Sequence, residues 1–201
     1  MGKRSDFKRN ARDFYRTPVE AVLPLTPFLR TTPRFAEPFV GDGAIVRALE
    51  PLGYECTFAC DIQPEGEAKA YAHTMGVLET NSRDYARCDV IVTNPPWPRP
   101  RADGEPTVSY IRALSIFKPT WMLLTADFMH NAYAADLIRN HCSDIVSVGR
   151  VKWMAGTKNT GMENAAWYCF WGDEGVEAPR FWPLRRPLPR VCAIGSVEDL
   201  I

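Results

Sequence analysis

The chain has 201 residues, and its 24 basic and 24 acidic side chains give a formal net charge of zero. This length suits one domain with a substantial core, and 46% apolar and 24% charged residues are ordinary values for a folded protein. No apolar run approaches the roughly 20 residues that span a bilayer, and the basic N-terminus lacks a secretory core, so we expect a cytoplasmic protein without a membrane partner.

Apolar runs alternate with helix-like segments, a pattern typical of an α/β fold with a mostly parallel sheet. Helices are predicted to begin near Pro18, Ala44, Gly66, Thr107 and Asn131. Strands are predicted at Arg34–Val40, Cys56–Cys60, Val77–Glu79, Asp89–Thr93, Trp121–Thr125, Ile145–Val151 and Ala165–Trp171. Segments 98–106 and 154–164 are predicted to be irregular, and the proline-rich tail 177–201 to be extended, with Phe181 and Trp182 as anchors.

Basic side chains gather near both ends of the sequence. Residues 1–16 hold six basic side chains against two acidic ones, and residues 179–190 hold four arginines and no acid. Such stretches suit contacts to phosphates, although solvated termini explain them equally well. The six cysteines form no C-x-x-C pair and the three histidines are scattered, so we expect buried free thiols and no metal site.

A turn with two glycines follows the first predicted strand. In Glu37–Ala44 (Glu-Pro-Phe-Val-Gly-Asp-Gly-Ala), Gly41 and Gly43 allow a sharp turn and a close approach to a ligand before a helix starts. A dinucleotide-binding fingerprint needs a third glycine where Val46 stands, which disfavours NAD and FAD. Taken alone, the turn is equally typical of a plain strand-to-helix connection.

Acidic residues near the ends of later strands add to this turn. Asp61 ends the second strand, 20 residues after Gly41, where a carboxylate accepts hydrogen bonds from both ribose hydroxyls of an adenosine. Ile62 follows it and is suited to the face of the adenine. Asp84, beside Tyr85 and before the fourth strand, is placed to accept from the adenine amino group. The combination indicates a cofactor that contains adenosine.

The most informative segment is Asn94-Pro95-Pro96-Trp97, which follows the buried strand Asp89–Thr93. The prolines stiffen the backbone and leave carbonyl acceptors free, and Asn94 adds an amide oxygen. Two acceptors can hold both hydrogens of one amino group and direct its lone pair at a methyl donor. Trp97 offers a flat face for a planar substrate, a stacking contact of roughly 1–3 kcal/mol for a nucleobase. At the carboxyl end of a parallel strand, this pattern favours a site over a packed proline turn.

These motifs, in this order, resemble those of class I S-adenosylmethionine-dependent amino-methyltransferases, whose N-P-P-aromatic motif Asn94–Trp97 matches. Phe14–Pro18 and Glu37–Ala44 resemble the cofactor motifs of the gamma group of DNA adenine-N6 methyltransferases, and short phage and prophage forms are most similar. The resemblance implies a Rossmann-like three-layer sandwich, with a mostly parallel seven-stranded sheet and one antiparallel strand near an edge. It covers about residues 13–171.

The resemblance also implies roles for individual residues. The substrate amino group would be held by Asn94, Pro95, Pro96 and Trp97. S-adenosylmethionine would be held by Tyr15, Thr17, Pro18, Glu37, Phe39, Gly41, Asp42, Gly43, Asp61, Ile62, Asp84, Tyr85 and Asn94. Substrate-side loops would contribute Arg99, Arg101, Lys152, Lys158 and Asn159.

The expected reaction is methylation of adenine N6 in a flipped-out base, with DNA favoured over RNA as the partner. Guanine N2, cytosine N4 and a protein glutamine amide present the same amino geometry and stay open, as does a non-catalytic partner subunit. No span is long enough for the recognition domain of sequence-specific relatives, so we expect a single methyltransferase domain, 1–201, with relaxed sequence preference.

Overall fold

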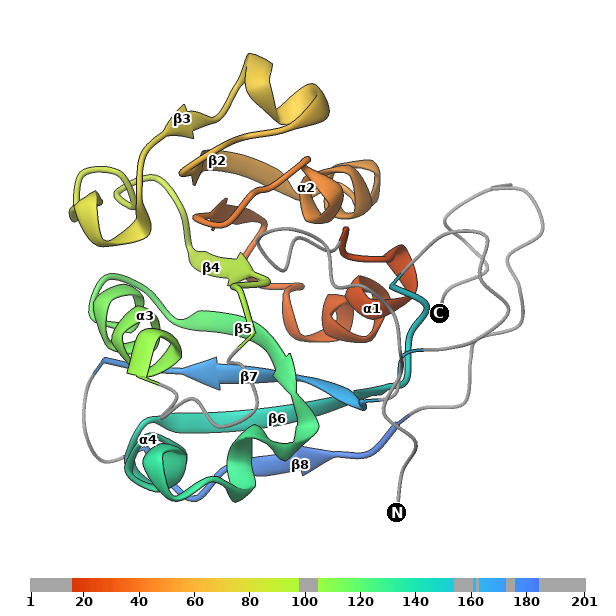
Figure 1. Cartoon of the computed structure of the whole chain (residues 1–201), viewed down its shortest axis with the longest axis vertical. Coiled ribbons are helices and arrows are strands. Elements are labelled where there is room, and N and C mark those ends of the chain that lie inside the picture. The colour runs from red at the N-terminus through yellow and green to blue at the C-terminus, as the bar shows by residue number, and fades with distance from the viewer. Residues whose placement is uncertain (1–15, 98–104, 154–160, 162, 173–175, 185–201) are drawn as a thin grey trace.

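The computed structural model describes residues 16–97, 105–153, 161, 163–172 and 176–184. An eight-stranded sheet in the order β3-β2-β1-β4-β5-β7-β6-β8 runs through the molecule (Figure 1). Its strands are β1 (Arg34–Glu37), β2 (Glu55–Asp61), β3 (His73–Thr74), β4 (Val90–Thr93), β5 (Thr120–Thr125), β6 (Cys142–Gly149), β7 (Ala165–Phe170) and β8 (Arg180–Trp182).

One strand runs against the others. β7 is antiparallel to both of its neighbours, β5 and β6, whereas the β1–β2, β1–β4, β2–β3, β4–β5 and β6–β8 pairs are parallel. The predicted mostly parallel sheet with an antiparallel strand near one edge is therefore confirmed. Because β1, β2 and β4 are parallel neighbours, their carboxyl ends meet at one edge, where ligands bind in α/β folds.

Helices cover both faces of the sheet. In Figure 1, α1 (Val19–Val22) and α2 (Ala44–Leu49) lie on the right, and α3 (Glu105–Ser115) and α4 (Ala135–Asn140) lie on the left. Short 3-10 helices connect these elements: η2 (Leu23–Phe28), η3 (Glu50–Leu52), η4 (Gly66–Ala70), η5 (Val77–Glu79), η6 (Ala126–His130) and η7 (Ala132–Ala134). The result is a three-layer α/β sandwich.

Strand alternation builds one core on each side of the sheet. In β5, Trp121 and Leu123 belong to the core under α1 and α2, whereas Met122 and Leu124 belong to the core under α3 and α4. The indole N–H of the fully buried Trp167 in β7 donates to the carbonyl of Ala21 at 2.7 Å, which fastens α1 to the sheet.

Two predicted segments have a different structure. Val77–Glu79, predicted as the third strand, is the 3-10 helix η5; the short strand β3 precedes it. The turn closes because Gly76 N–H donates to Glu79 Oε1 at 3.2 Å and Glu79 N–H donates to Gly76 O at 3.0 Å. The helix predicted to begin near Gly66 is likewise a five-residue 3-10 helix.

Six of the seven predicted strands are present, and β3 and β8 were not predicted, so the sheet has eight strands rather than the expected seven. Strand β8 comes from the proline-rich tail. Arg180–Trp182 pairs with β6, and the Trp182 ring meets Phe28 at a centroid distance of 5.2 Å. Phe181 is 60% exposed, so of the two predicted anchors it is Trp182 that packs against the core. Residues 185–201 lie outside the described part of the chain.

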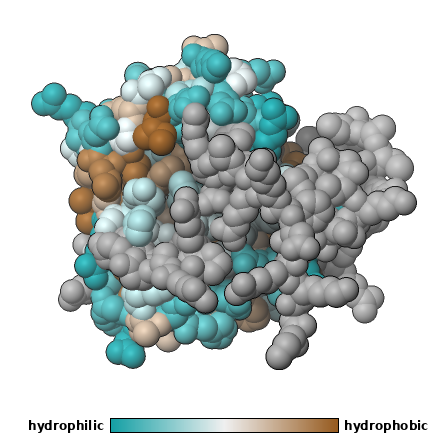
Figure 2. Space-filling model, in the orientation of Figure 1, coloured by the Kyte–Doolittle hydropathy of each residue, from teal (hydrophilic) through white to brown (hydrophobic). Residues whose placement is uncertain are grey.

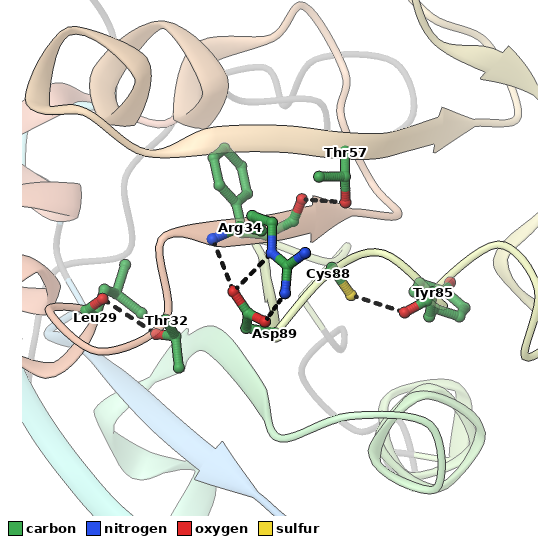
Figure 3. A network of polar contacts seen from close by, with 8 residues as sticks. Leu29, Thr32, Arg34, Thr57, Tyr85, Cys88 and Asp89 are labelled. Atoms are coloured by element: carbon green, nitrogen blue, oxygen red, sulfur yellow. Dashed lines mark hydrogen bonds and ion pairs between the residues drawn. The ribbon is translucent and has the colours of Figure 1, made fainter.

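The amino ends of β1 and β4 are joined by an ion pair (Figure 3). Arg34 Nη2 and Nε donate to the Asp89 carboxylate at 2.6 and 3.2 Å, and Arg34 backbone N–H donates to it at 3.2 Å. Because its anion accepts these bonds, the pKa of Asp89 is lowered. On the neighbouring strand, the hydroxyl of Thr57 donates to the carbonyl of Phe35.

The five cysteines within the described residues carry free thiols, four of them buried, as expected. Burial raises the pKa of Cys60 to about 12 and that of Cys88 to about 11, so these thiols stay protonated and unreactive.

Candidate active site

The glycine turn connects the carboxyl end of β1 to α2 as the sequence predicted. Gly41 and Gly43 have positive φ angles of 53° and 83°, which glycine adopts without steric cost. A side chain at Gly43 would also collide with the hydroxyl of Tyr71. The turn is thus closed by tight backbone geometry, with no side-chain cap on the first turn of α2.

Asp61 holds this turn from the neighbouring strand. Its Oδ2 accepts from Gly41 N–H at 3.0 Å, and its Oδ1 accepts from Gln63 N–H at 2.8 Å. Each carboxylate oxygen has further lone pairs, so both can still accept from a ligand hydroxyl. The spacing of 20 residues between Gly41 and Asp61 therefore corresponds to a direct contact.

An apolar surface lies beside Asp61. Ile62 is 72% exposed and Leu78, in η5, is 63% exposed. Figure 2 shows apolar side chains gathered on the visible face over the segment between β2 and β4. An exposed apolar surface next to a carboxylate suits a nucleoside, whose base is flat and whose ribose carries hydroxyls.

The middle residue of the turn, Asp42, joins it to the N-terminal segment. Its buried carboxylate accepts from Arg47 Nη2 and from Arg16 Nε, both at 3.0 Å. Arg16 precedes Thr17 and Pro18, and Pro18 leads directly into α1. Asp42 therefore helps to place Thr17 next to the glycine turn.

Two buried polar atoms near the turn lack hydrogen-bond partners among the described residues, Glu37 Oε2 and Thr93 Oγ1. They belong to the last residues of β1 and β4, so both lie at the carboxyl edge of the sheet. Burial raises the pKa of Glu37 well above its ordinary value of 4.5, and the nearby carboxylates of Asp42 and Asp61 raise it further. A buried carboxyl with a free oxygen is suited to a cationic ligand group, which would favour its ionised form.

The Asn-Pro-Pro-Trp motif follows β4. Asn94 and Trp97 are half-buried, Pro95 is buried and Pro96 is exposed. Asn94 Nδ2 donates to the hydroxyl oxygen of the buried Thr17 at 3.1 Å, which connects the motif to the N-terminal segment. The Trp97 indole N–H lies 3.0 Å from Asn94 Oδ1 and 2.9 Å from the carbonyl oxygen of Leu123 in β5.

A second tryptophan, not singled out from the sequence, lies beside the motif. The Trp153 ring packs nearly perpendicular to Trp97, at 5.0 Å and 83°. Gly161 packs against the Trp153 indole, and its N–H donates to Val151 O at 2.8 Å. Trp153 lies just beyond the end of β6, directly after Lys152. An aromatic residue close to the end of a predicted strand was the sequence signal that could have pointed to it.

Two predicted cofactor residues, Asp84 and Tyr85, make contacts of their own within the fold. Tyr85 is fully buried and stacks on Phe117 in the core under α3, with its hydroxyl on Thr80 Oγ1. Asp84 Oδ2 accepts from the backbone N–H and side-chain amide of Asn81 at 2.8 and 2.9 Å.

Of the remaining predicted residues, two lie within the described part of the chain and five lie outside it. Phe39 is half-buried and packs edge-on against Tyr110 of α3, and Lys152 is exposed. Outside the described residues lie Tyr15, Arg99, Arg101, Lys158 and Asn159. Within the described residues, no three His, Cys, Asp or Glu side chains group as metal ligands, and no helix is long and apolar enough to cross a membrane.

No protein-family model matches the chain, and no curated protein matches its sequence. Solved structures do match it. A chain of a type I restriction–modification system superposes with a TM-score of 0.54 and 18% identity, over 90% of this chain and 46% of that one. A protein described as a modification subunit of a type I restriction enzyme from Vibrio vulnificus YJ016 gives 0.51 and 14%, over 83% and 45%.

A third match is the 23S rRNA methyltransferase ErmE, with a TM-score of 0.50 and 13% identity over 82% of this chain and 71% of that one. This chain spans less than half the length of the two restriction–modification chains. At such identities the likeness concerns the fold. The chain has the fold of class I methyltransferases, as its motifs led us to expect.

Proposed function

We propose that this protein transfers a methyl group from S-adenosylmethionine to an exocyclic amino group, and that its substrate is adenine N6 in DNA. The observation that carries the proposal is the hydrogen bond of 3.1 Å between Asn94 and Thr17. It joins the Asn-Pro-Pro-Trp motif to the segment that Asp42 fastens to the glycine turn. A group suited to hold an amino substrate thus adjoins a turn suited to hold a nucleoside cofactor.

The described residues fit the proposed cofactor. Asp61 would accept from the ribose hydroxyls, while Ile62 and Leu78 would cover the adenine. Glu37, buried with an unpartnered oxygen, would accept from the ammonium group, whose positive charge offsets the cost of ionising a buried carboxyl. When bound, S-adenosylmethionine supplies an electrophilic methyl group on a sulfonium.

The chain's own groups would act on the substrate nitrogen. Asn94 Oδ1 and the Pro95 carbonyl would accept its two hydrogens, which localises the nitrogen lone pair. Acceptors that are already oriented add no reorganisation cost at the moment of transfer. The base would rest against Trp97, with Trp153 beside it, after leaving its stack.

The choice of DNA adenine rests on the motif order, on the aromatic pair and on the basic stretches. Phosphate contacts would come from the N-terminal stretch, Arg99, Arg101, Lys152 and Lys158, with Asn159 beside the substrate. Such contacts position a nucleic acid without reading its sequence and weaken steeply with salt. Two of the structural matches belong to DNA restriction–modification systems and one is an rRNA methyltransferase, so DNA and RNA are tested side by side.

The deciding experiment offers duplex DNA, single-stranded RNA and a protein mixture together with labelled S-adenosylmethionine. The modified unit is identified by mass spectrometry, with the Asn94→Ala variant as the matched blank. N6-methyladenine in DNA supports the proposal. Another product would identify a different substrate: N6-methyladenine or N2-methylguanine in RNA, N4-methylcytosine, or a methylated glutamine. Cofactor binding without transfer to any of them would indicate a non-catalytic subunit.

A further inference from the structure

The Asn94 side chain is held at both ends of its amide. Nδ2 donates to Thr17 Oγ1 at 3.1 Å, and Oδ1 lies 3.0 Å from Trp97 Nε1. An amide can be turned over to exchange its oxygen and nitrogen, and the two orientations differ little in shape. In the overturned orientation, Asn94 would present N–H donors where an amino substrate needs an acceptor.

Trp97 determines which orientation is stable. An indole N–H is a donor without acceptor capacity, so the Asn94 atom facing it must be the oxygen. The indole itself is fixed, because the same N–H lies 2.9 Å from the carbonyl of Leu123 in the middle of β5. A tyrosine or phenylalanine ring in place of Trp97 would supply a flat face but no such N–H.

Thr17 contributes differently. A hydroxyl accepts as readily as it donates, so Thr17 anchors the amide without choosing its orientation. Thr17 is buried, with 9% of the residue exposed, so water competes little for this bond. Once the amide is held, Asn94 Oδ1 keeps one lone pair for a substrate hydrogen, and the Thr17 hydroxyl proton is free for another acceptor.

We propose that Thr17 and Trp97 are positioning residues. The Thr17 hydroxyl and the Trp97 indole N–H fix the Asn94 amide with its oxygen toward the substrate. This inference rests on the proposed function, because it assigns the amide an amino group to receive. It gives Trp97 a second task besides stacking: the N–H selects the acceptor orientation, and the ring supports the base.

The first test measures single-turnover methyl transfer with cofactor and DNA both saturating. Thr17→Val and Trp97→Phe should each slow transfer by about threefold to tenfold, the equivalent of one neutral hydrogen bond. Thr17→Ser should restore the rate, and Thr57→Val, which removes a hydroxyl at the far end of β2, should leave it unchanged. In an Asn94→Ala background, Thr17→Val should cause no further loss. Equal losses in both backgrounds would overturn the proposal.

The second test needs no substrate. In the free protein, nuclear magnetic resonance signals of the Asn94 side-chain amide are assigned by their disappearance in Asn94→Ala. Thr17→Val should speed exchange of one amide proton, Thr17→Ser should not, and Trp97→Phe should shift both signals. Unchanged signals in Thr17→Val and Trp97→Phe would overturn the proposal. If the wild-type protein methylates none of the offered substrates, the proposed function fails, while these signals still decide whether the amide is held.

Discussion

The two ends of strands β1 and β4 are built in opposite ways. At the amino ends, Arg34 and Asp89 satisfy each other through three hydrogen bonds (Figure 3). At the carboxyl ends, Glu37 and Thr93 bury polar atoms without partners among the described residues. The pKa values of the two carboxyl groups differ for this reason: the bonds from Arg34 lower the pKa of Asp89, and burial raises the pKa of Glu37. One end is complete as folded, and the other has groups left for a ligand.

If the carboxyl ends of β1 and β4 form the site, Asn94→Ala should have the largest effect, on the rate of methyl transfer. Losing one oriented acceptor should slow methyl transfer by about 10²–10³-fold, as the loss of an oxyanion-hole donor does. Cofactor affinity, measured by calorimetry, should stay within a few-fold, and Asn140→Ala at the end of α4 serves as the control. Full activity of Asn94→Ala would refute the proposed mechanism.

Asp61→Ala should have the next largest effect, on binding. Each charge-assisted hydrogen bond lost costs about 1.5–3 kcal/mol, so we expect the S-adenosylmethionine dissociation constant to rise by about tenfold or more. The variant also releases the N–H of Gly41 from its partner. Glu67→Ala, which removes an exposed charge from η4, is the control for net charge. Wild-type affinity of Asp61→Ala would show that the cofactor binds elsewhere.

Glu37→Gln should change the pH dependence of stability. With a raised folded-state pKa, Glu37 contributes stability that is present below the ordinary value of 4.5 and is lost as pH rises toward the folded-state pKa. A glutamine stays neutral, so its thermal midpoint should fall less over that interval than the wild-type midpoint. Parallel curves would contradict the burial argument. Cofactor binding should also release protons in the wild type and not in Glu37→Gln.

The smallest effect is expected from Arg34→Met at the opposite end of the sheet. Asp89, with its lowered pKa, contributes stability above its ordinary value of 3.8 that is lost as pH falls through the lowered pKa. Removing the Arg34 side chain should reduce this acid-side loss, with the backbone N–H of residue 34 still donating to Asp89, and should lower the thermal midpoint slightly, because exposed ion pairs stabilise little. Methyl-transfer rates should stay at the wild-type level. A drop in rate would mean that the two ends are not independent.

The sequence was most informative where a motif is local. The glycine turn and Asn94 follow strands whose apolar pattern is plain, and parallel pairing brings them to one edge. The strand predicted at Val77–Glu79 was wrong because three residues are too few to show the periodicity that distinguishes a strand from a turn. Tyr85 was grouped with Asp84 by adjacency, but neighbouring residues need not share a face, and its ring lies in the core.

The contacts that organise the site were beyond prediction for a different reason. Thr17 and Asn94 are 77 residues apart, and Trp97 reaches the carbonyl of Leu123 on another strand. No spacing rule relates such positions; only the complete sheet brings them together. Trp153 was not predicted for the same reason, because only the packing of the fold brings it beside Trp97.

The bond between Trp167 and Ala21 has a consequence for synthesis of the protein. It links residues 146 positions apart and fastens α1, which begins just after Thr17. A nascent chain contains the glycine turn, Asp61 and the Asn-Pro-Pro-Trp motif long before β7 leaves the ribosome. Until β7 inserts between β5 and β6, α1 lacks this anchor, and Thr17 is held through the Arg16–Asp42 ion pair and its bond to Asn94 without it. The proposed methyl transfer would therefore reach its full rate only once β7, and so most of the chain, has been made.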